Sequence, residues 1–138
     1  MLQAMSPGHD GSIATIHANS PRESIGRLEM MMLLGGFSIP QRAMRQQIAS
    51  AINIIVHVSR LSDGTRKLMK ISEISGMEGE TIMMQDLYEF TRTEISADGK
   101  IIGNHHSTSI RSFYSHQIEV AGFKLDLTPR PAMRANAR

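Results

Sequence analysis

Residues 8–20 gather two histidines with hydroxyl side chains, a carboxylate and an amide, directly before a predicted helix start. The segment reads Gly-His-Asp-Gly-Ser-Ile-Ala-Thr-Ile-His-Ala-Asn-Ser, and no later stretch is as dense in such groups. Imidazole, hydroxyl and amide groups can all donate hydrogen bonds to the oxygens of an anion. This segment is therefore the first candidate for a site that binds a charged ligand.

The elements that position these groups can be predicted from the same residues. The segment Ser12–Ala18 alternates in a way typical of a strand, with Ile13, Thr15 and His17 on one face. Both faces are apolar or small, which predicts a central strand buried between helix layers. His17 then lies at the carboxyl end of the strand, the edge of an α/β sheet where ligands bind.

A helix start follows immediately and strengthens the case for an anion. Ser20 fits an N-cap, Pro21 the first helical position, and Glu23 the residue that reaches back in a capping box. A free helix N-terminus beside His17 and Asn19 is a natural place for a phosphate. The local chemistry points to an anion, of which a nucleotide is the commonest.

Two alternatives for the histidines stay open at this point. A histidine at a strand end is more often a hydrogen-bonded structural residue than a catalytic one. Metal binding by His9 and His17 is disfavoured, since no third ligand is obvious nearby and the chain has no cysteine.

Helix and turn signals divide the rest of the chain into short elements. Apolar residues recur at helical spacing from Pro21 to about Leu34 and again after Pro40, and Gly35–Gly36 provides a stop between the two helices. The run Ile54–Val58 is apolar and β-branched, which predicts a buried strand. The expected turns and the last helix are Ser62–Thr65, Gly76–Gly79, Asp98–Gly99 and Ile110–Ala121.

Polar residues outside the first segment are expected to be mainly structural. The polar face of the second helix, which includes Arg45, is a candidate subunit contact. Asp86 and Glu89 are expected to be solvent-facing carboxylates, with no pair spaced for general acid and base work. His105–His106 should point to opposite faces of a strand, because adjacent residues alternate there.

Composition excludes several classes of protein. The chain has 138 residues, a formal charge of +2 and a hydrophobic share of 41%, so electrostatics do not indicate a nucleic-acid partner. The absence of cysteine suits a cytoplasmic protein. No apolar run approaches the ~20 residues of a membrane span. With eleven methionines, Met30–Met32 is expected to be core, with a partner-facing surface as the alternative.

Several short motifs along the chain match a known family. The similarity covers most of the chain and becomes weaker after about Ile118. The matching positions are Leu2–Met5, Gly8–Ser12, Thr15, His17–Asn19, Arg27–Glu29, Gln47–Ala51, Asp63–Gly64, Arg66 and Gly76–Gly79. Together they resemble the histidine box and following segments of the ATPases of type II and type IV secretion and pilus systems. The resemblance is strongest to the CpaF-like branch that powers tight-adherence (Tad/Flp) pili.

The resemblance implies a fold, cofactors and partners. The expected fold class is α/β, a partial RecA-like (P-loop NTPase) C-terminal domain with antiparallel hairpins at the sheet edge and a C-terminal helix. The intact protein would bind ATP and Mg²⁺ and form a hexameric ring. The ring would be cytoplasmic and would meet the inner membrane only through secretion or pilus platform proteins. By resemblance His17 and His9 are catalytic, and Thr15, Asn19 and Arg27 bind the nucleotide.

The ATPases of this family carry a phosphate-binding loop, G-x-x-x-x-G-K-[ST], and a catalytic glutamate upstream of the histidine box. No such loop occurs in these residues, so enzyme activity of this chain alone is uncertain. We expect the carboxyl-terminal part of a longer motor protein, with residues 1–127 in the ATPase domain and residues 128–138 as a disordered basic tail.

Two functions from other classes remain as alternatives. The chain can be a stand-alone, non-catalytic module that binds or regulates a secretion motor ring. It can also be a metal-dependent hydrolase that uses His9, Asp10 and His17, although the sequence does not place the further ligands such a site needs.

Overall fold

The computed structural model describes residues 11–36 and 38–124, and these form two compact units. The helical unit comprises the described residues up to Ile55 together with Glu73–Gln85. The sheet unit comprises Val56–Ser72 together with the described residues from Asp86 onward. Two long strands, β2 (Arg66–Glu78) and β3 (Thr81–Ile95), contribute residues to both units.

Helix α1 (Pro21–Leu34) begins and ends as the sequence predicts. Extended Ser20 is the N-cap, and its hydroxyl accepts a hydrogen bond from the Glu23 backbone N–H at 3.1 Å. Beyond the C-terminal end, Gly36 has a φ of +77°, a left-handed conformation that glycine adopts without strain. Local sequence alone therefore defines both ends of this helix.

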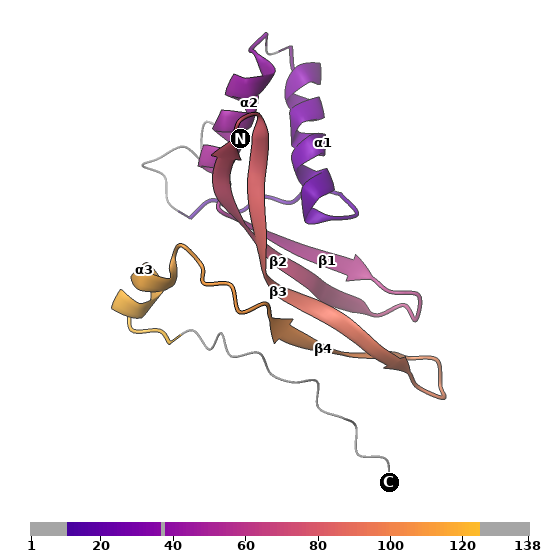
Figure 1. Cartoon of the computed structure of the whole chain (residues 1–138). Helices are drawn as coiled ribbons and strands as arrows, with labels where there is room; N and C mark the ends of the chain where they lie inside the picture. Colours follow the sequence, from indigo (N-terminus) through magenta and orange to yellow (C-terminus); the bar gives the residue numbers. More distant parts are fainter. Residues whose placement is uncertain (1–10, 37, 125–138) are drawn as a thin grey trace. The chain divides into compact units, whose positions relative to one another are not determined.

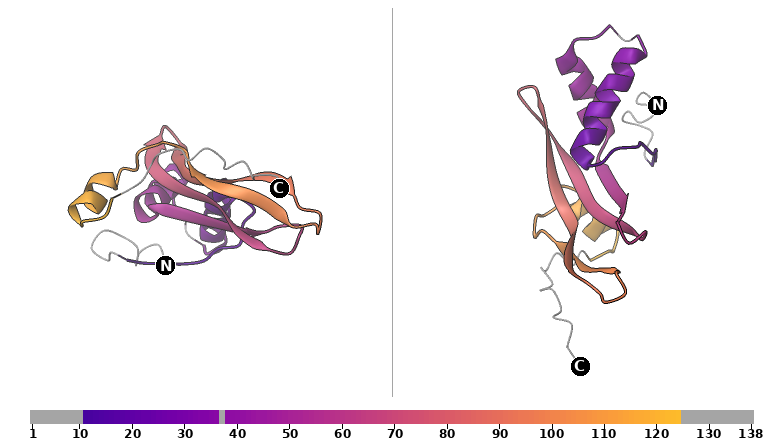
Figure 2. Two further views of the ribbon diagram at one scale, coloured as in Figure 1. Left: turned by 90° about the horizontal axis from the view of Figure 1, so that it is seen from below. Right: turned by 90° about the vertical axis from the view of Figure 1, so that its right-hand side faces the viewer.

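Helix α2 (Gln41–Ala51) follows Pro40, and together with α1 it covers the tip of the β2–β3 hairpin within the helical unit (Figure 1). The right-hand view of Figure 2 shows the two helices side by side next to that tip. The core between them is apolar and buries Met44 completely. Its buried members are Ile25, Leu28, Met32, Met44, Ile48, Ile74 and Ile82.

Four strands form one sheet in the order β1-β2-β3-β4, with β1 at Ile54–Arg60 and β4 at Ile101–Ser107. The short connections between neighbouring strands are hairpins, which join antiparallel strands. The antiparallel hairpins expected from the sequence are thus confirmed, as is the mixture of helices and strands. No parallel pair occurs among the described strands, so a RecA-like fold remains a prediction.

The prediction that Ile54–Val58 is a buried strand is only half right. The strand exists, but β1 lies at the edge of the sheet, and the side chains of Val56 and Val58 are 58% and 55% exposed. Exposed and half-buried residues alternate along it, as in an antiparallel strand with one covered face.

Two of the three predicted turns are confirmed and one lies at a different place. Gly64 and Gly99 have φ angles of +81° and +79° in the turns before β2 and β4. The turn predicted at Gly76–Gly79 begins too early, because β2 continues through Gly76 to Glu78. The chain turns instead at the two residues that separate β2 from β3, where Gly79 has a φ of +58°.

The ends of the chain depart most from the predictions. The last helix, α3, spans only Ser115–Val120, and the expected helix over Ile110–Ala121 is wrong in its first half. Phe113 is exposed and does not form part of a helical core stripe, whereas the stop at Gly122 is confirmed by its φ of +87°. The predicted tail at residues 128–138 lies outside the described residues.

The predicted strand Ser12–Ala18 is also wrong. These residues form no strand, and Ile13 is 95% exposed. A central strand requires neighbours on both sides, and the described strands pair only with one another. Among the described residues no helix is both long and apolar enough to cross a bilayer.

Candidate functional site

The segment that carries His17 is attached to α1 by hydrogen bonds just after the histidine. The backbone and side-chain N–H groups of Asn19 donate to the Glu23 carboxylate at 3.1 and 2.9 Å. Ser20 accepts from the backbone N–H groups of Glu23 and Ser24, each at 3.1 Å. The carboxylate of the predicted capping box thus reaches Asn19, one residue before the N-cap.

These bonds change what the start of α1 can bind. The N–H groups of Glu23 and Ser24 are already engaged by Ser20, and Pro21 has no N–H. The Glu23 carboxylate lies where an anion would interact with the helix dipole. The first turn of α1 therefore offers a phosphate fewer free N–H groups than the sequence suggested, and an anion at this helix start stays a prediction.

The predicted site residues lie on two neighbouring parts of the helical unit. Thr15, His17 and Asn19 are exposed residues of the segment before α1, and Arg27 is exposed on α1 itself. Within the described residues His17 makes no hydrogen bond, and Asn19 donates to Glu23 rather than to His17. His9 lies outside the described residues. The catalytic and nucleotide-binding roles of these residues stay predictions.

Two arginines hold the tip of the β2–β3 hairpin against the helices. Arg22 of α1 donates to the Ile82 carbonyl at 2.6 Å, and Arg45 of α2 donates to the Glu80 carbonyl at 2.8 Å. Arg45 also donates to both carboxylate oxygens of Glu29, at 2.8 and 3.3 Å, which raises the pKa of its guanidinium. Arg45 was expected on a polar face that could contact another subunit, but it is half-buried and joins α1, α2 and the hairpin.

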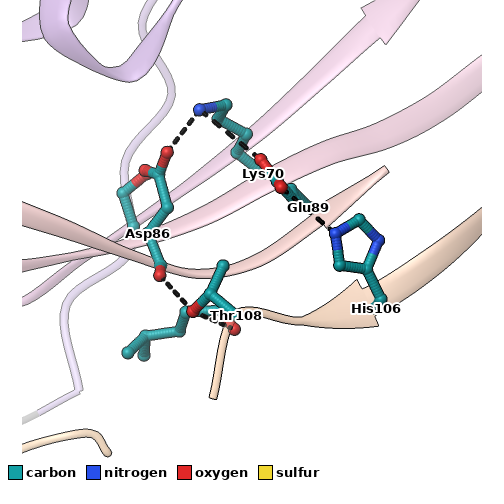
Figure 3. A network of polar contacts seen from close by, with 7 residues as sticks. Lys70, Asp86, Glu89, His106 and Thr108 are labelled. Atoms are coloured by element: carbon teal, nitrogen blue, oxygen red, sulfur yellow. Dashed lines mark hydrogen bonds and ion pairs between the residues drawn. The ribbon is translucent and has the colours of Figure 1, made fainter. Parts of the chain in front are cut away.

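A network of charged side chains crosses β2, β3 and β4 in the sheet unit, as Figure 3 shows. Lys70 forms ion pairs with Asp86 and, at 4.0 Å, with Glu89. His106 contacts the same Glu89, with Nε2 and Oε1 separated by 3.1 Å. Asp86 and Glu89 were expected to be solvent-facing carboxylates, whereas in the structure Lys70 connects them.

This network has the properties of a structural ion cluster. The pKa of Lys70 is raised, chiefly by its hydrogen bond to Asp86. The amine therefore stays charged near neutral pH and cannot act as a base there. Asp86 is further engaged at both ends, because Ser72 donates to its carboxylate and Thr108 donates to its backbone carbonyl, each at 2.6 Å. We infer that this ion cluster has a structural role and holds β2, β3 and β4 in register.

The neighbouring histidines of β4 point to different partners, as predicted. The Nε2 atom of His105 lies 3.0 Å from the Leu68 carbonyl, and its ring packs on Phe90 with centroids 5.0 Å apart. His106 faces Glu89 instead. No group of three or more His, Cys, Asp or Glu side chains within residues 11–36 and 38–124 is arranged to hold a metal ion.

The carboxylate of Asp63 links two turns at one end of the sheet unit. Its Oδ2 accepts the Ile101 backbone N–H at 2.8 Å, and its Oδ1 accepts the backbone N–H and the hydroxyl of Thr65 at 2.9 and 2.7 Å. The pKa of Asp63 is lowered below its ordinary value. The hydrogen bond from the Ile101 backbone N–H contributes most, and the two bonds from Thr65 add to it. The sequence identifies the turn but not the bond to β4.

We expect the Asp63→Asn variant to be less stable than the wild type near neutral pH, because an amide nitrogen then faces one of these donors. Since the folded-state pKa lies below the unfolded value of about 3.9, the contribution of the carboxylate is present above about pH 4. It is lost as the pH falls through the folded-state pKa. Urea denaturation at several pH values measures the difference, with Ser62→Ala as a control in the same turn. A difference that does not shrink below about pH 4 would contradict this account.

The sequence that forms the histidine-bearing segment, the capped helix α1 and the following hairpins matches the model of a known protein family. The family model described as "Type II/IV secretion system protein" matches residues 1–117, and the chain belongs to this family. The resemblance found in the sequence is confirmed at this level.

Individual relatives match a shorter stretch. A putative conjugal transfer protein of Mycobacterium tuberculosis (strain ATCC 25618 / H37Rv) is 37% identical over 79 residues, which is 57% of this chain and 22% of the relative. Conjugal transfer protein TrbB of Rhizobium radiobacter is 30% identical over the same length and the same shares. A probable TrbB of Sinorhizobium fredii (strain NBRC 101917 / NGR234) is 32% identical over 66 residues, 48% of this chain and 19% of the relative. The matched region spans about a fifth of these relatives.

Proposed function

We propose that this chain forms the carboxyl-terminal part of an ATPase subunit in a hexameric secretion motor. In the intact subunit, ATP hydrolysis would drive pilus assembly or the export of protein. The family match over residues 1–117 carries the proposal, because it includes both the histidine-rich segment and the helical unit behind it. The intact subunit would also contain the RecA-like nucleotide domain, work in the cytoplasm and dock on inner-membrane platform proteins.

The described residues support a role in contacting phosphate more than a role in holding a metal. His17 and Arg27 are exposed, and neither makes a hydrogen bond within the described part of the chain, so their N–H groups are available to a ligand. No group of three or more His, Cys, Asp or Glu side chains among the described residues is arranged to hold a metal ion.

Phosphoryl transfer depends mainly on positioning and on stabilising charge. ATP with Mg²⁺ would supply the transferred phosphoryl group. The ring of His17 would donate a hydrogen bond to a phosphate oxygen and so report whether the terminal phosphate is present. Arg27 would steady a phosphate or face the next subunit of the ring. Asn19, through Glu23, would hold the backbone after His17 to α1.

Exposed apolar side chains fit both the motor part and the stand-alone interaction module, since each would supply a protein partner. Ile13 within the histidine-bearing segment, and Val56 and Val58 on the edge strand, are open to solvent in this chain. Apolar side chains on an edge strand are suited to burial against further protein. Both proposals provide such a partner, but the motor also accounts for the family match.

The branch of the family is a finer part of the proposal. The residues quoted from the histidine box and from Gly76–Gly79 support the CpaF-like branch and a tight-adherence pilus. The names of the relatives refer to conjugal transfer, so a motor of a conjugal transfer system is the second candidate. Reading the coding DNA upstream of the Met1 codon tests the shared part, since a motor requires an in-frame G-x-x-x-x-G-K-[ST] loop there.

We expect His17→Ala, made in the intact subunit, to slow ATP turnover at least tenfold while ring assembly is preserved. Steady-state ATP hydrolysis and native mass spectrometry measure the two properties. The matched control is His116→Ala, which removes an exposed histidine of α3 and should leave both unchanged. Unchanged turnover in the His17 variant would reject the assignment.

A further inference from the structure

The segment that carries His17 is connected to β3 through a chain of hydrogen bonds. Asn19 and Ser20 bond to Glu23 and Ser24, which lie in the first turn of α1. In the same turn, Ser24 donates its hydroxyl to the Pro21 carbonyl at 2.6 Å. The backbone on either side of Ser20 therefore has to move together with the start of α1.

The start of α1 is bonded in turn to β3 through the side chain of Arg22. Arg22 Nη1 donates to the Ile82 carbonyl at 2.6 Å, across 60 positions of sequence. The acceptor is well fixed, because the Ile82 side chain is buried in the core of the helical unit. A charged donor on a neutral carbonyl makes a stronger bond than a neutral donor does.

From these contacts we propose that Arg22 is a positioning residue for His17. It holds the first turn of α1 on β3, and the bonds from Asn19 and Ser20 transfer that position to the segment that carries the histidine. Displacement of His17 by a ligand would then be passed to the β2–β3 hairpin through the same bond. The inference rests on the proposed function for its consequence in ATP turnover, but the positioning itself can be tested without nucleotide.

Hydrogen exchange of the 138-residue chain tests the positioning directly. We expect Arg22→Ala to reduce the protection of the Asn19, Glu23 and Ser24 amides at least tenfold, because these three donate to the bonds in question. The amides of Met44 and Ile52 in and after α2 should keep their protection. Arg22→Lys retains a charged donor and should restore part of the loss.

The matched control is Arg42→Ala, which removes an exposed arginine of α2 that makes no hydrogen bond within the described residues. It should leave all five amides unchanged. Unchanged protection of the first-turn amides in Arg22→Ala overturns the inference. An equal loss at all five amides also overturns it, because Arg22 would then act on general stability alone.

The ATPase assay separates this inference from the proposed function. In the intact subunit, Arg22→Ala should lower kcat with little change in KM for ATP, and Arg22→Lys should recover part of kcat. If exchange changes as expected while His17→Ala leaves turnover intact, the proposed function fails and the positioning stands. If His17→Ala is inactive while Arg22→Ala changes neither exchange nor kcat, the proposed function stands and the positioning fails.

Discussion

Met44→Ala is expected to lower the free energy of unfolding of the helical unit by about 2–5 kcal/mol. The Met44 side chain is 0% exposed and belongs to the core formed by α1, α2 and the hairpin tip. Truncation removes its buried methylene, sulfur and methyl groups and leaves a cavity that α1 and the hairpin can only partly close. Urea denaturation followed by circular dichroism gives the size of the loss. Hydrogen exchange of the α2 amides places it in this unit.

The chain offers a control with the same chemical change. Met31 lies within α1 and is 54% exposed, so Met31→Ala removes the same atoms from a helix without opening a core cavity. Methionine and alanine differ little in helix propensity, and we expect a change within about 0.5 kcal/mol. Equal losses for the two variants would contradict the burial of Met44 and the division of the methionines between core and surface.

This division shows how far the sequence predicts the helical unit. Both ends of α1 and the start of α2 follow from nearby residues, namely the Ser20 cap, Gly36 and Pro40. The expectation that Met30–Met32 is core holds only for Met32, because Met30 and Met31 lie on the far side of α1. Helical spacing assigns faces correctly, but a run of three similar residues always covers more than one face.

Burial of strands was predicted less well, for a physical reason. Apolar sequence in Ser12–Ala18 and in β1 indicates that a strand can be buried, but the burial itself is supplied by neighbouring elements. In this structure β1 has a neighbour on one side only, and Ser12–Ala18 has no paired strand among the described residues. Composition of a segment does not contain that information.

The polar contacts depend on register, which local sequence does not determine. Along β3 and β4, Arg92 pairs with Gly103 but Glu94 pairs with Ile102, so the register shifts by one residue between these pairs. Without that shift, Glu89 would face a different residue and His106 would lie on the opposite side of the sheet. The Asp98–Gly99 turn was predictable, but the pairing of Glu89 with His106 was not.

The sequence predicted individual residues of the candidate site, but it did not predict the hydrogen bonds that arrange them. The sequence singled out the Ser20 cap and the neighbouring Asn19, and the structure shows both at the start of α1. It missed the bond from Arg22 to Ile82, since no local pattern connects residues so distant in sequence. Arginine at the start of a helix has many uses, and only the folded hairpin supplies this acceptor.

Gly103→Ala is expected to destabilise the sheet unit by about 1–3 kcal/mol. A Cβ atom at this position would lie 2.4 Å from a ring carbon of Phe90 and 2.5 Å from the Thr91 carbonyl oxygen. The ring cannot withdraw freely, because it also packs on His105 and lies under Lys67 Nζ at 6.0 Å from its centroid. Thermal and urea denaturation of the variant measure the loss.

Gly26→Ala is the matched control for this steric argument and should have the opposite sign. Apart from the adjacent residues and the nearby backbone of α1, no atom of the described residues lies within 4 Å of a Cβ atom built at Gly26, in the interior of α1. Alanine favours the helix over glycine, so we expect a gain of about 0.5–1 kcal/mol. In a Phe90→Leu background, Gly103→Ala should cost less but should remain destabilising, because the Thr91 carbonyl belongs to the backbone and stays in place. A stable Gly103→Ala variant would show that β3 and β4 can separate at this point, and that Phe90 does not fix their spacing.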